Sequence, residues 1–320
     1  MGNQLITKTP YNNTPDRCTA ARHVVVIGGM NMDLGASPSA ALKLRDSNPG
    51  RIRLRPGGVG RNIAHDLRLL GLDVSLVTAL GGDVFAGALK ESCRELGIDL
   101  SMAREMPAER SGVYLYVTDE AGDMALAVSD MELMAAITPE YLAPRMERIN
   151  RADAVILDAN LRSETLRYAA ENCTAPLYAD PVSTAKAGKL KGILHRLHTL
   201  KPNALEAEAL TGEKDPERAA LALREAGVKR VFISLGAEGL LAAGERELIR
   251  LPCVKTEVVN TNGAGDAATA ALVWAGVLGL DLSRAAQAAA LAGAITAGSG
   301  ETNPAELRIL PGRFGRKEKG

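Results

Sequence analysis

The stretch Asn260-Thr261-Asn262-Gly263-Ala264-Gly265-Asp266, followed by the run 267–275, decides how this sequence is interpreted. Two glycines flank an alanine, a carboxylate follows, and the next residues are good helix formers, so the pattern predicts a glycine-rich loop leading into a helix. The amides at such a helix end attract negative charge, and glycine lets a ligand approach the backbone. This arrangement suits phosphoryl transfer from a nucleotide to a hydroxyl, with Asp266 accepting the proton. An ordinary helix N-cap is the alternative interpretation.

Composition limits the classes of protein to consider. The chain has 320 residues, of which 46% are hydrophobic, so it can bury a large core. Lys plus Arg and Asp plus Glu both number 38, and this zero net charge disfavours broad binding to nucleic acid or membranes. No apolar run reaches the length of about 18 residues that a membrane span needs. The polar segment 1–21 lacks the apolar region of a signal peptide, and we expect a flexible tail there.

Cysteine and histidine spacing indicates neither a disulfide framework nor a direct metal site. The cysteines are widely separated and form no CxxC pair: Cys18, Cys93, Cys173 and Cys253. Free thiols in a reducing compartment are the expected state, which favours a cytoplasmic location. The four histidines contain no HExxH motif.

Polar residues follow the apolar run His23–Gly29, which predicts a buried strand of a parallel sheet. Asn31 and Asp33 lie just beyond it, where open α/β sheets bind ligands. Both residue types also favour turns, so a turn without a ligand is the alternative. The segment 30–33 lacks a GxGxxG pattern, which disfavours a dinucleotide-binding domain.

A second glycine motif, Gly57-Gly58-Val59-Gly60-Arg61-Asn62, precedes an amphipathic pattern that ends at Gly71. Three glycines in four residues allow the backbone to approach a ligand, and Asn62 would present a side chain from the first helical turn. A loop that merely needs positive φ angles is the alternative. The run 74–80 predicts another buried strand, followed by a helix to about Leu96.

Three segments predict a small separate sheet. Arg51–Arg55 alternates basic and apolar residues, and 112–118 with 124–128 form a predicted hairpin. Such a sheet could close over a site as a lid. Four of its side chains are too apolar for a solvated sheet, so we expect them to cover substrate or a second subunit: Ile52, Leu54, Tyr114 and Tyr116.

From Asp153 onward, apolar runs alternate with helical patterns, which predicts a parallel sheet with right-handed crossovers. The expected strands are 154–157, 177–179, 199–201 and 231–234, and the expected helices are 163–172, 187–197, 203–211 and 216–226. Polar residues at the strand ends are Asn160, Asp180, Asn203 and Ser234. Asn203 and Glu206 match a helix capping box, or alternatively a phosphate or Mg²⁺-water role. A helix of small residues is expected over 283–298.

In order and spacing, these motifs resemble the ribokinase-like carbohydrate and nucleoside kinases, the PfkB family, over about residues 22–305. The resemblance implies an α/β fold: a three-layer αβα sandwich with a mainly parallel central sheet and a small β-sheet lid. It further implies one kinase domain over 22–312, with the lid formed from about 33–56 and 108–130, and a basic tail over 313–320.

The resemblance also assigns roles to the motifs. Asp266 matches the base, and Gly263, Ala264 and Gly265 match the anion-hole amides. Residues expected at the substrate are Asn31, Asp33, Gly57, Gly58, Arg61, Asn62, Ser129, Asp130 and Asn160. Residues expected at ATP and its Mg²⁺ are Asn203, Glu206, Ser234, Gly236, Gly239, Thr261, Thr302 and Asn303, the last two near the adenine. No side chain is expected to bind Mg²⁺ directly. Many relatives bind a monovalent cation with an Asp where this chain has Asn260, which puts K⁺ binding in question, although backbone carbonyls could still supply ligands.

Within the family, the sequence is similar to the pseudouridine kinases. The similarity lies in 46–50, in Arg61 where ribokinases usually carry alanine, and in 127–131 and 158–160. It implies transfer of a phosphoryl group from MgATP to the 5′-hydroxyl of pseudouridine. The C-linked uracil carries a ring N–H that uridine lacks, and we hypothesise that Ser129 or Asp130 accepts it.

Two alternatives to this function remain open at this stage. The chain could phosphorylate ribose, adenosine or another nucleoside, since the phosphoryl-transfer motifs are shared. It could bind a ligand without turnover, although the intact Asp266 motif argues against this. A homodimer formed through the lid is the expected assembly.

Overall fold

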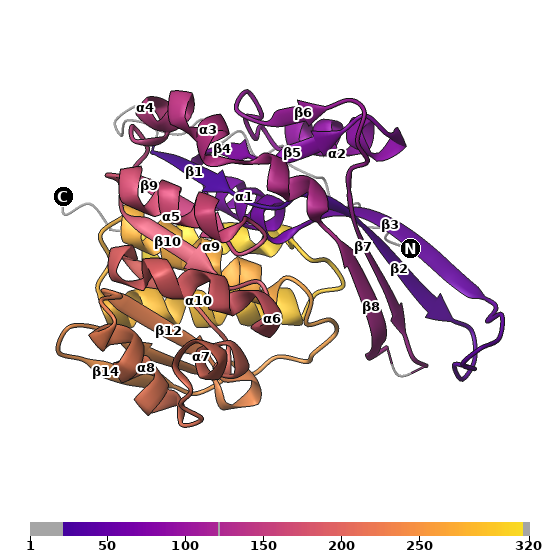
Figure 1. Cartoon of the computed structure of the whole chain (residues 1–320). Coiled ribbons are helices and arrows are strands. Elements are labelled where there is room, and N and C mark those ends of the chain that lie inside the picture. Colours follow the sequence, from indigo (N-terminus) through magenta and orange to yellow (C-terminus); the bar gives the residue numbers. More distant parts are fainter. Residues whose placement is uncertain (1–21, 121, 316–320) are drawn as a thin grey trace, which may run out of the picture.

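The computed structural model describes residues 22–120 and 122–315, and its centre is an eight-stranded sheet (Figure 1). The strand order is β14-β13-β12-β11-β10-β9-β1-β4, and all pairs are parallel except those of β13, which runs antiparallel to both β12 and β14. Its strands are β1 (His23–Ile27), β4 (Asp73–Val77), β9 (Ala154–Asp158), β10 (Leu177–Asp180), β11 (Thr199–Leu200), β12 (Arg230–Ser234), β13 (Leu240–Ala243) and β14 (Leu248–Leu251). The predicted mainly parallel sheet is confirmed.

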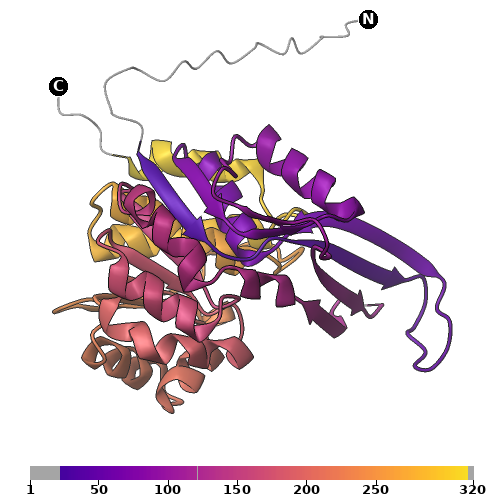
Figure 2. The same ribbon diagram turned by 45° about the horizontal axis from the view of Figure 1, so that its top comes forward.

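Alternation along the strands produces two separate cores. In β1, Val24 and Val26 pack into one hydrophobic cluster, whereas Val25 and Ile27 pack into the other. Successive side chains of a strand point to opposite faces, so a strand buried on both faces is apolar throughout. Helices cover both faces, which gives the three layers seen in Figures 1 and 2.

Long helices on the two faces are assigned by their buried residues. One face carries α1 (Val59–Leu69), α2 (Val84–Glu95), α9 (Ala264–Val277) and α10 (Leu282–Ala297). The other carries α5 (Ser163–Asn172), α7 (Ala204–Thr211) and α8 (Pro216–Glu225). Short helices are η1 (Glu132–Ala136), α3 (Pro139–Leu142), η2 (Ala143–Arg145), α4 (Met146–Ile149), α6 (Thr184–Ala187), η3 (Gly188–Arg196), η4 (Gly236–Glu238), η5 (Ala305–Arg308) and α11 (Ile309–Phe314).

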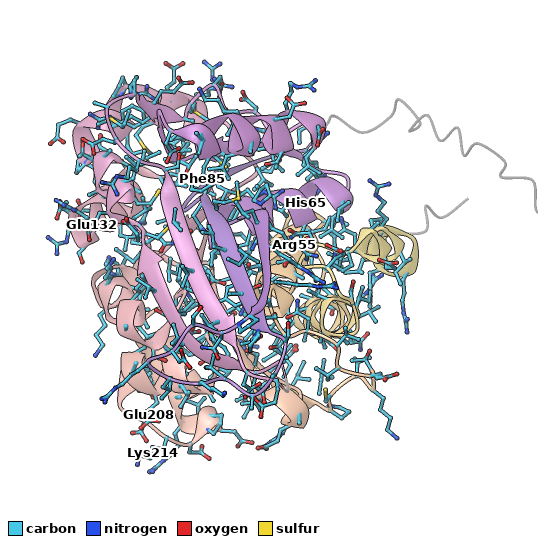
Figure 3. All side chains as sticks on the ribbon, turned by 90° about the vertical axis from the view of Figure 1, so that its right-hand side faces the viewer. Arg55, His65, Phe85, Glu132, Glu208 and Lys214 are labelled. Atoms are coloured by element: carbon cyan, nitrogen blue, oxygen red, sulfur yellow. The ribbon has the colours of Figure 1, made fainter. Side chains whose placement is uncertain are left out.

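The lid is a four-stranded sheet that extends away from the main body on the right of Figure 1. Its order is β3-β2-β7-β8, formed by β3 (Gly50–Gly57), β2 (Asn31–Pro38), β7 (Gly112–Thr118) and β8 (Met124–Asp130). Asn31 and Asp33 therefore lie on a lid strand, and the turn that was the alternative for them is wrong. The side chain of Arg55 on β3 is labelled in Figure 3. Its NH1 atom forms a salt bridge with Oε2 of Glu301 at 3.1 Å, which joins the lid to the loop after α10.

The two lid faces differ in character, because residues paired across strands share a face. One row across the sheet is Arg55, Asp33, Tyr114 and Ser129, and the neighbouring row on the opposite face is Leu54, Leu34, Leu115 and Val128. The four side chains expected to form one covering surface are thus divided. Tyr114 and Tyr116 share the face of Asp33, whereas Ile52 and Leu54 lie on the other face.

Three boundaries differ from the prediction. The expected strand 74–80 is divided after Val77: β5 (Ala79–Gly81) leaves the central sheet and pairs with β6 (Arg104–Met106). The expected helix 187–197 is mostly the 3₁₀-helix η3, whose Gly188 and Gly192 disfavour an α-helix. The domain boundary expected at residue 312 falls inside α11. The domain extends at least to Phe314, whose side chain is buried in the core.

Two further expectations concern termini and membranes. The segments expected as tails, 1–21 and most of 313–320, lie outside the described residues, as does Cys18. Within the described part of the chain, Cys93, Cys173 and Cys253 are free thiols, and no helix is long and apolar enough to cross a membrane.

Candidate active site

The N-terminus of α9 is built as an open helix end. Gly263 has a φ angle of +80°, in the left-handed region, and no side chain caps the helix. A Cβ atom at Gly263 would lie 2.5 Å from Cγ2 of Thr302, so only glycine fits between the loop and Thr302. The Ala264 amide donates to the Thr261 carbonyl at 3.3 Å. Because no side chain caps the helix, no side-chain acceptor occupies the first turn of α9, as binding of an anion requires.

Asp266 lies in this first turn, beside groups of both charges. Oδ2 of its carboxylate accepts a hydrogen bond from Nδ2 of Asn62 at 2.9 Å. The pKa of Asp266 is raised to about 8: burial is the largest cause, the neighbouring Asp180 and Asp158 also raise the pKa, and Asn62 and Lys201 lower it. A carboxyl group with a pKa near neutrality can accept a proton from a hydroxyl and later release it.

Lys201 is a site residue that the sequence interpretation left without a role. It follows β11 and is buried, and its Nζ atom lies 3.6 Å from where a Cβ atom of Gly265 would stand. The lysine therefore places a positive charge against the glycine-rich loop. Its signal in the sequence was its place at the carboxyl end of a strand, just before Pro202.

The polar residues expected at the sugar gather at the base of the lid. Nδ2 of Asn31 donates to Oδ1 of Asp33 at 2.6 Å. The Asp33 carboxylate covers Gly57, where a Cβ atom would lie 2.2 Å from Oδ2. Burial raises the pKa of Asp33 to about 6, while Asn31 and Arg61 oppose that shift. Gly58, with a φ angle of +98°, turns the chain from β3 into α1.

Arg61 of α1 and Asn303 of the loop after α10 are hydrogen-bonded to each other. Both residues were expected at ligands, Arg61 at the substrate and Asn303 near the adenine. Arg61 is buried, and its NH1 atom donates to Oδ1 of Asn303 at 3.3 Å and to Oδ1 of Asn62 at 3.4 Å. The Asn303 side chain donates to Oδ1 of Asp66 at 2.8 Å. The structure thus brings both together beside Asn62, and they bond protein groups.

Asn203 and Glu206 form the capping box that was one of their two interpretations. Oδ1 of Asn203 accepts from the Glu206 amide at 2.8 Å, and Oε2 of Glu206 accepts from the Asn203 amide at 2.9 Å. Glu206 is buried, which raises its pKa, as does the nearby Asp180. Asn203 also bridges to Ser234 at the end of β12, so these residues share one edge of the sheet.

The remaining expected residues fall at two places. After β12, Gly236 and Gly239 both have positive φ angles and form the turn into β13. On the lid side, Ser129 shares the face of Asp33, whereas Asp130 pairs with Val113 on the opposite face. Oδ1 of Asn160 accepts from Nζ of Lys186 at 2.6 Å.

Two kinds of ion site remain to be considered, a monovalent cation site near Asn260 and a metal site formed by side chains. Oδ1 of Asn260 accepts from the Asn262 amide at 3.0 Å, which is turn chemistry. Within the described residues, no cluster of three or more His, Cys, Asp or Glu side chains could hold a metal ion.

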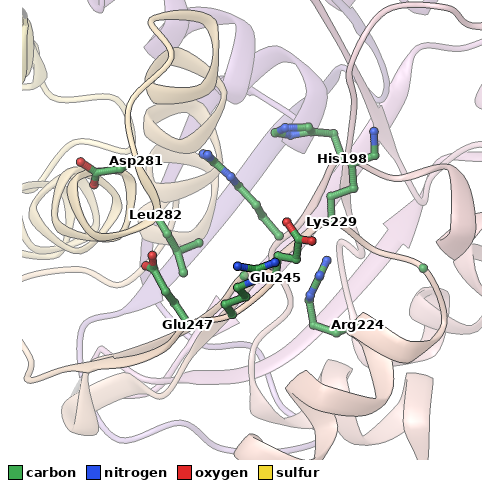
Figure 4. A pocket seen from close by; sticks show the side chains of 11 residues that line it. His198, Arg224, Lys229, Glu245, Glu247, Asp281 and Leu282 are labelled. Carbon is green, nitrogen blue, oxygen red and sulfur yellow. The ribbon is translucent and has the colours of Figure 1, made fainter.

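A large cavity lies elsewhere in the molecule. It measures about 1010 Å³ and lies near the edge of the sheet opposite the glycine-rich loop (Figure 4). Polar and charged residues line it, among them His198, Arg224, Lys229 and Glu245, and none of the expected site residues is among its lining. The chemistry described above is therefore not in this cavity.

Comparison with known proteins identifies the family. The model of the pfkB family of carbohydrate kinases matches residues 21–308. The chain belongs to this family. It is therefore a phosphotransferase whose acceptor is an alcohol group.

Relatives within the family differ in their names. A pseudouridine kinase of Escherichia coli (strain K12) is 36% identical over 294 residues, which cover 90% of this chain and 94% of that protein. An uncharacterized sugar kinase of the same strain is 33% identical, covering 89% of this chain and 81% of the relative. The ribokinase structure from Thermotoga maritima, 24% identical, superposes with a TM-score of 0.81 over 90% of this chain and 99% of that one.

Proposed function

We propose that this kinase transfers the γ-phosphoryl group of ATP to the 5′-hydroxyl of pseudouridine, giving pseudouridine 5′-phosphate and ADP. The observation that carries the chemistry is the Asp266 carboxylate at the open end of α9, hydrogen-bonded to Asn62 at 2.9 Å. The choice of nucleoside is supported by the 36% identical pseudouridine kinase, which matches this chain over 90% of its length.

The reaction follows from the residues around Asp266. As the 5′-oxygen forms a bond to the γ-phosphorus, the bond from that phosphorus to the bridging oxygen of ADP breaks. The hydroxyl proton passes to the Asp266 carboxylate. Negative charge on the transferring group is stabilised by amides of the Gly263–Gly265 loop and by the Lys201 ammonium group, which lies against Gly265.

The nucleoside would lie between the main body and the lid. Asp33 and Asn31 would accept and donate hydrogen bonds to the ribose hydroxyls, with Gly57 and Gly58 close to the sugar, and Asn160 nearby. The base would lie beneath the lid face that carries Tyr114. Of the two acceptors hypothesised for the extra ring N–H, Ser129 is the better one, because it shares a lid face with Asp33 whereas Asp130 does not.

ATP would bind along the carboxyl ends of the strands. We assign Ser234, Gly236, Gly239, Thr261 and Thr302 to its surroundings. Asn203 and Glu206 would hold Mg²⁺ through water, since both lie at the sheet edge where Asn203 bridges to Ser234. The metal would neutralise charge on the phosphates. Asn260 would mark a monovalent cation site only through backbone carbonyls. The cytoplasm is the compartment that supplies ATP.

We also propose a homodimer through the apolar lid face. Two rows of apolar side chains cross all four strands on the face opposite Asp33. Ile52, Leu54 and Val128 are 69%, 54% and 63% exposed, which is a large contiguous apolar patch for a solvated sheet. A second copy of the same face would cover it isologously.

The test of substrate identity is ADP release from MgATP with pseudouridine, uridine, adenosine and ribose under one condition. We expect strong turnover with pseudouridine and at least ~10-fold less with uridine, because the Ser129 acceptor is unpaired with uridine. Ser129→Ala should reduce the ratio of turnover with pseudouridine to turnover with uridine, and Asp130→Ala should leave this ratio unchanged. Turnover with ribose or adenosine instead would replace the proposed substrate while retaining Asp266 as the base. Binding without any turnover would favour a silent member of the family.

A further inference from the structure

Asn303 is the centre of a buried polar network between α1 and the loop after α10. Its Nδ2 atom donates to Oδ1 of Asp66 at 2.8 Å and to the backbone oxygen of Asn62 at 3.2 Å. Its Oδ1 atom accepts from NH1 of Arg61 at 3.3 Å. The donor and acceptor atoms of the Asn303 amide are therefore both engaged with groups of α1.

This network leads directly to the catalytic carboxylate. Asn62 is held at two points, its backbone oxygen by Asn303 and its Oδ1 atom by Arg61 at 3.4 Å. The remaining amide nitrogen of Asn62 points at Asp266 and donates to it at 2.9 Å. The orientation of this donor thus depends on contacts that themselves depend on Asn303.

The same loop contacts the anion hole. Thr302, the neighbour of Asn303, packs against Gly263 so closely that a Cβ atom there would lie 2.5 Å from Thr302 Cγ2. Two consecutive residues therefore join the N-terminus of α9 to the side of α1. A displacement of this loop would be transmitted to the anion hole and to Asn62 together.

The network costs stability, which indicates a role beyond packing. Asp66 is fully buried, and its Oδ2 atom and Nε of Arg61 have no hydrogen-bond partner. Burial raises the pKa of Asp66, the charge of Asp266 raises it further, and Asn303 and Arg61 oppose the shift. Buried polar groups without partners are destabilising, and such groups gather where function requires them.

We propose that Asn303 is a positioning residue for phosphoryl transfer: together with Asp66 and Arg61 it fixes Asn62, and through Asn62 the carboxylate of Asp266. This inference rests on the kinase chemistry of Asp266 and does not depend on which nucleoside is the acceptor. It replaces the expectation that Asn303 contacts adenine.

The proposal has a signature in the pH dependence of turnover. Five groups face the Asp266 carboxylate: Asn62 and Asp66 from α1, Asp158 from β9, Asp180 from β10 and Lys201 after β11. The Asn62 hydrogen bond lowers the pKa of Asp266. When Asn62 loses its orientation, this effect weakens, the pKa of Asp266 rises, and a higher pH is needed to ionise the base.

The test is Asn303→Ala, assayed by ADP release with the best acceptor and by the carboxyl ¹³C NMR titration of Asp266 without substrate. We expect kcat to fall about 10-fold, the KM for ATP to change less than about threefold, and the Asp266 titration to move up by about 0.5 pH unit. A higher KM for ATP with kcat and titration unchanged would establish the adenine contact instead. Lower stability alone would reduce the network to a structural role.

If Asn303→Ala folds poorly, a second test exchanges the amide of Asn303 and the carboxylate of Asp66. Asn303→Asp retains the acceptor for Arg61 but loses the donor to Asp66, so kcat should fall. Adding Asp66→Asn restores a donor opposite the new carboxylate, and kcat should recover at least about threefold over the single variant. No recovery would contradict the proposal. Asn172→Ala, an exposed asparagine that bonds Tyr168 O on α5, is the control for general effects.

Discussion

Asp266 is poised by opposing neighbours. Burial and two carboxylates, Asp180 and Asp158, favour its neutral form, while Asn62 and Lys201 favour its charged form. The outcome is a pKa of about 8, close to the pH at which a cellular kinase works. A general base is most effective when its pKa lies near the working pH, because it is then both substantially ionised and still basic. The same burial that creates the base also makes its ionised form costly to the fold.

The substitution Asp266→Asn should separate these two effects. Turnover should fall by several orders of magnitude while ATP binding is retained, because the amide cannot accept the proton. Stability should rise. The folded pKa of about 8 lies above the ordinary value of 3.8, so the wild-type protein loses stability as pH rises between these values. The gain from the substitution should therefore grow from pH 4 to pH 8 and level off above.

Urea unfolding at several pH values measures this gain. Glu95→Gln on α2, which removes an exposed carboxylate, is the matched control and should show no such trend. Near-normal turnover of Asp266→Asn would remove Asp266 from the role of base. A stability gain that does not depend on pH would mean that the carboxylate is not buried as described.

Individual residues of the site were predictable to different degrees. The Gly263–Asp266 motif and the pair Asn31 and Asp33 were found because each lies beside a loop or strand end with a recognisable pattern. Lys201 also lies at a strand end, but this signal is weak, since one lysine before a proline is common. The bonds of Asn303 to α1 could not be predicted either, because 237 positions separate it from Asp66 and only the folded chain brings them together.

At the scale of elements, helix α1 depends on the conformation at its two ends. Gly58 precedes it with a φ angle of +98°, and Gly71 follows it with a φ angle of +85°. A Cβ atom at Gly58 would lie 2.6 Å from the Gly29 carbonyl oxygen and 2.8 Å from Oδ1 of Asn31, whereas one at Gly71 would meet nothing within 4 Å. Both glycines therefore have a positive φ angle, but only Gly58 is closely surrounded by other atoms.

Gly58→Ala and Gly71→Ala should consequently differ in function. Both should lose about 1 kcal/mol of stability for a side chain at positive φ. Gly58→Ala should lose more, and should raise the KM for the nucleoside at least about 10-fold, because the clash displaces Asn31 and the start of α1. Gly71→Ala should leave that KM within about twofold. Unfolding and steady-state kinetics provide the measurements, and equal effects on KM would contradict the role given to Gly58.

The elements themselves follow their local patterns where those patterns are strong. Helix α5 was predicted with the bounds that the structure has, since an amphipathic pattern lies between clear breaks. The strand expected over 74–80 was divided because its continuous apolar pattern holds for both β4 and β5, which pair with different partners. Pairing partners are a tertiary property, and a single sequence window does not contain them.

For the whole molecule, the lid separates two tasks by face. Its polar face, with Asp33, Tyr114 and Ser129 in one row, is turned to the site, whereas Leu54 and Val128 on its apolar face are exposed. The sequence predicted a lid and predicted that its side chains are too apolar for a solvated sheet. It did not predict that the aliphatic side chains lie on one face and the tyrosines on the other. That division follows from register, which one residue of slippage would invert.

The apolar face should therefore control assembly. If two copies join through it, Leu54→Lys and Val128→Lys place unpaired charges in the interface, and the dimer dissociation constant should rise at least about 30-fold. Sedimentation of wild-type and variant proteins over a range of concentrations measures this. Leu221→Lys on α8, where the leucine is 51% exposed, is the matched control and should not alter assembly. A wild-type protein that is monomeric at every concentration would contradict the dimer.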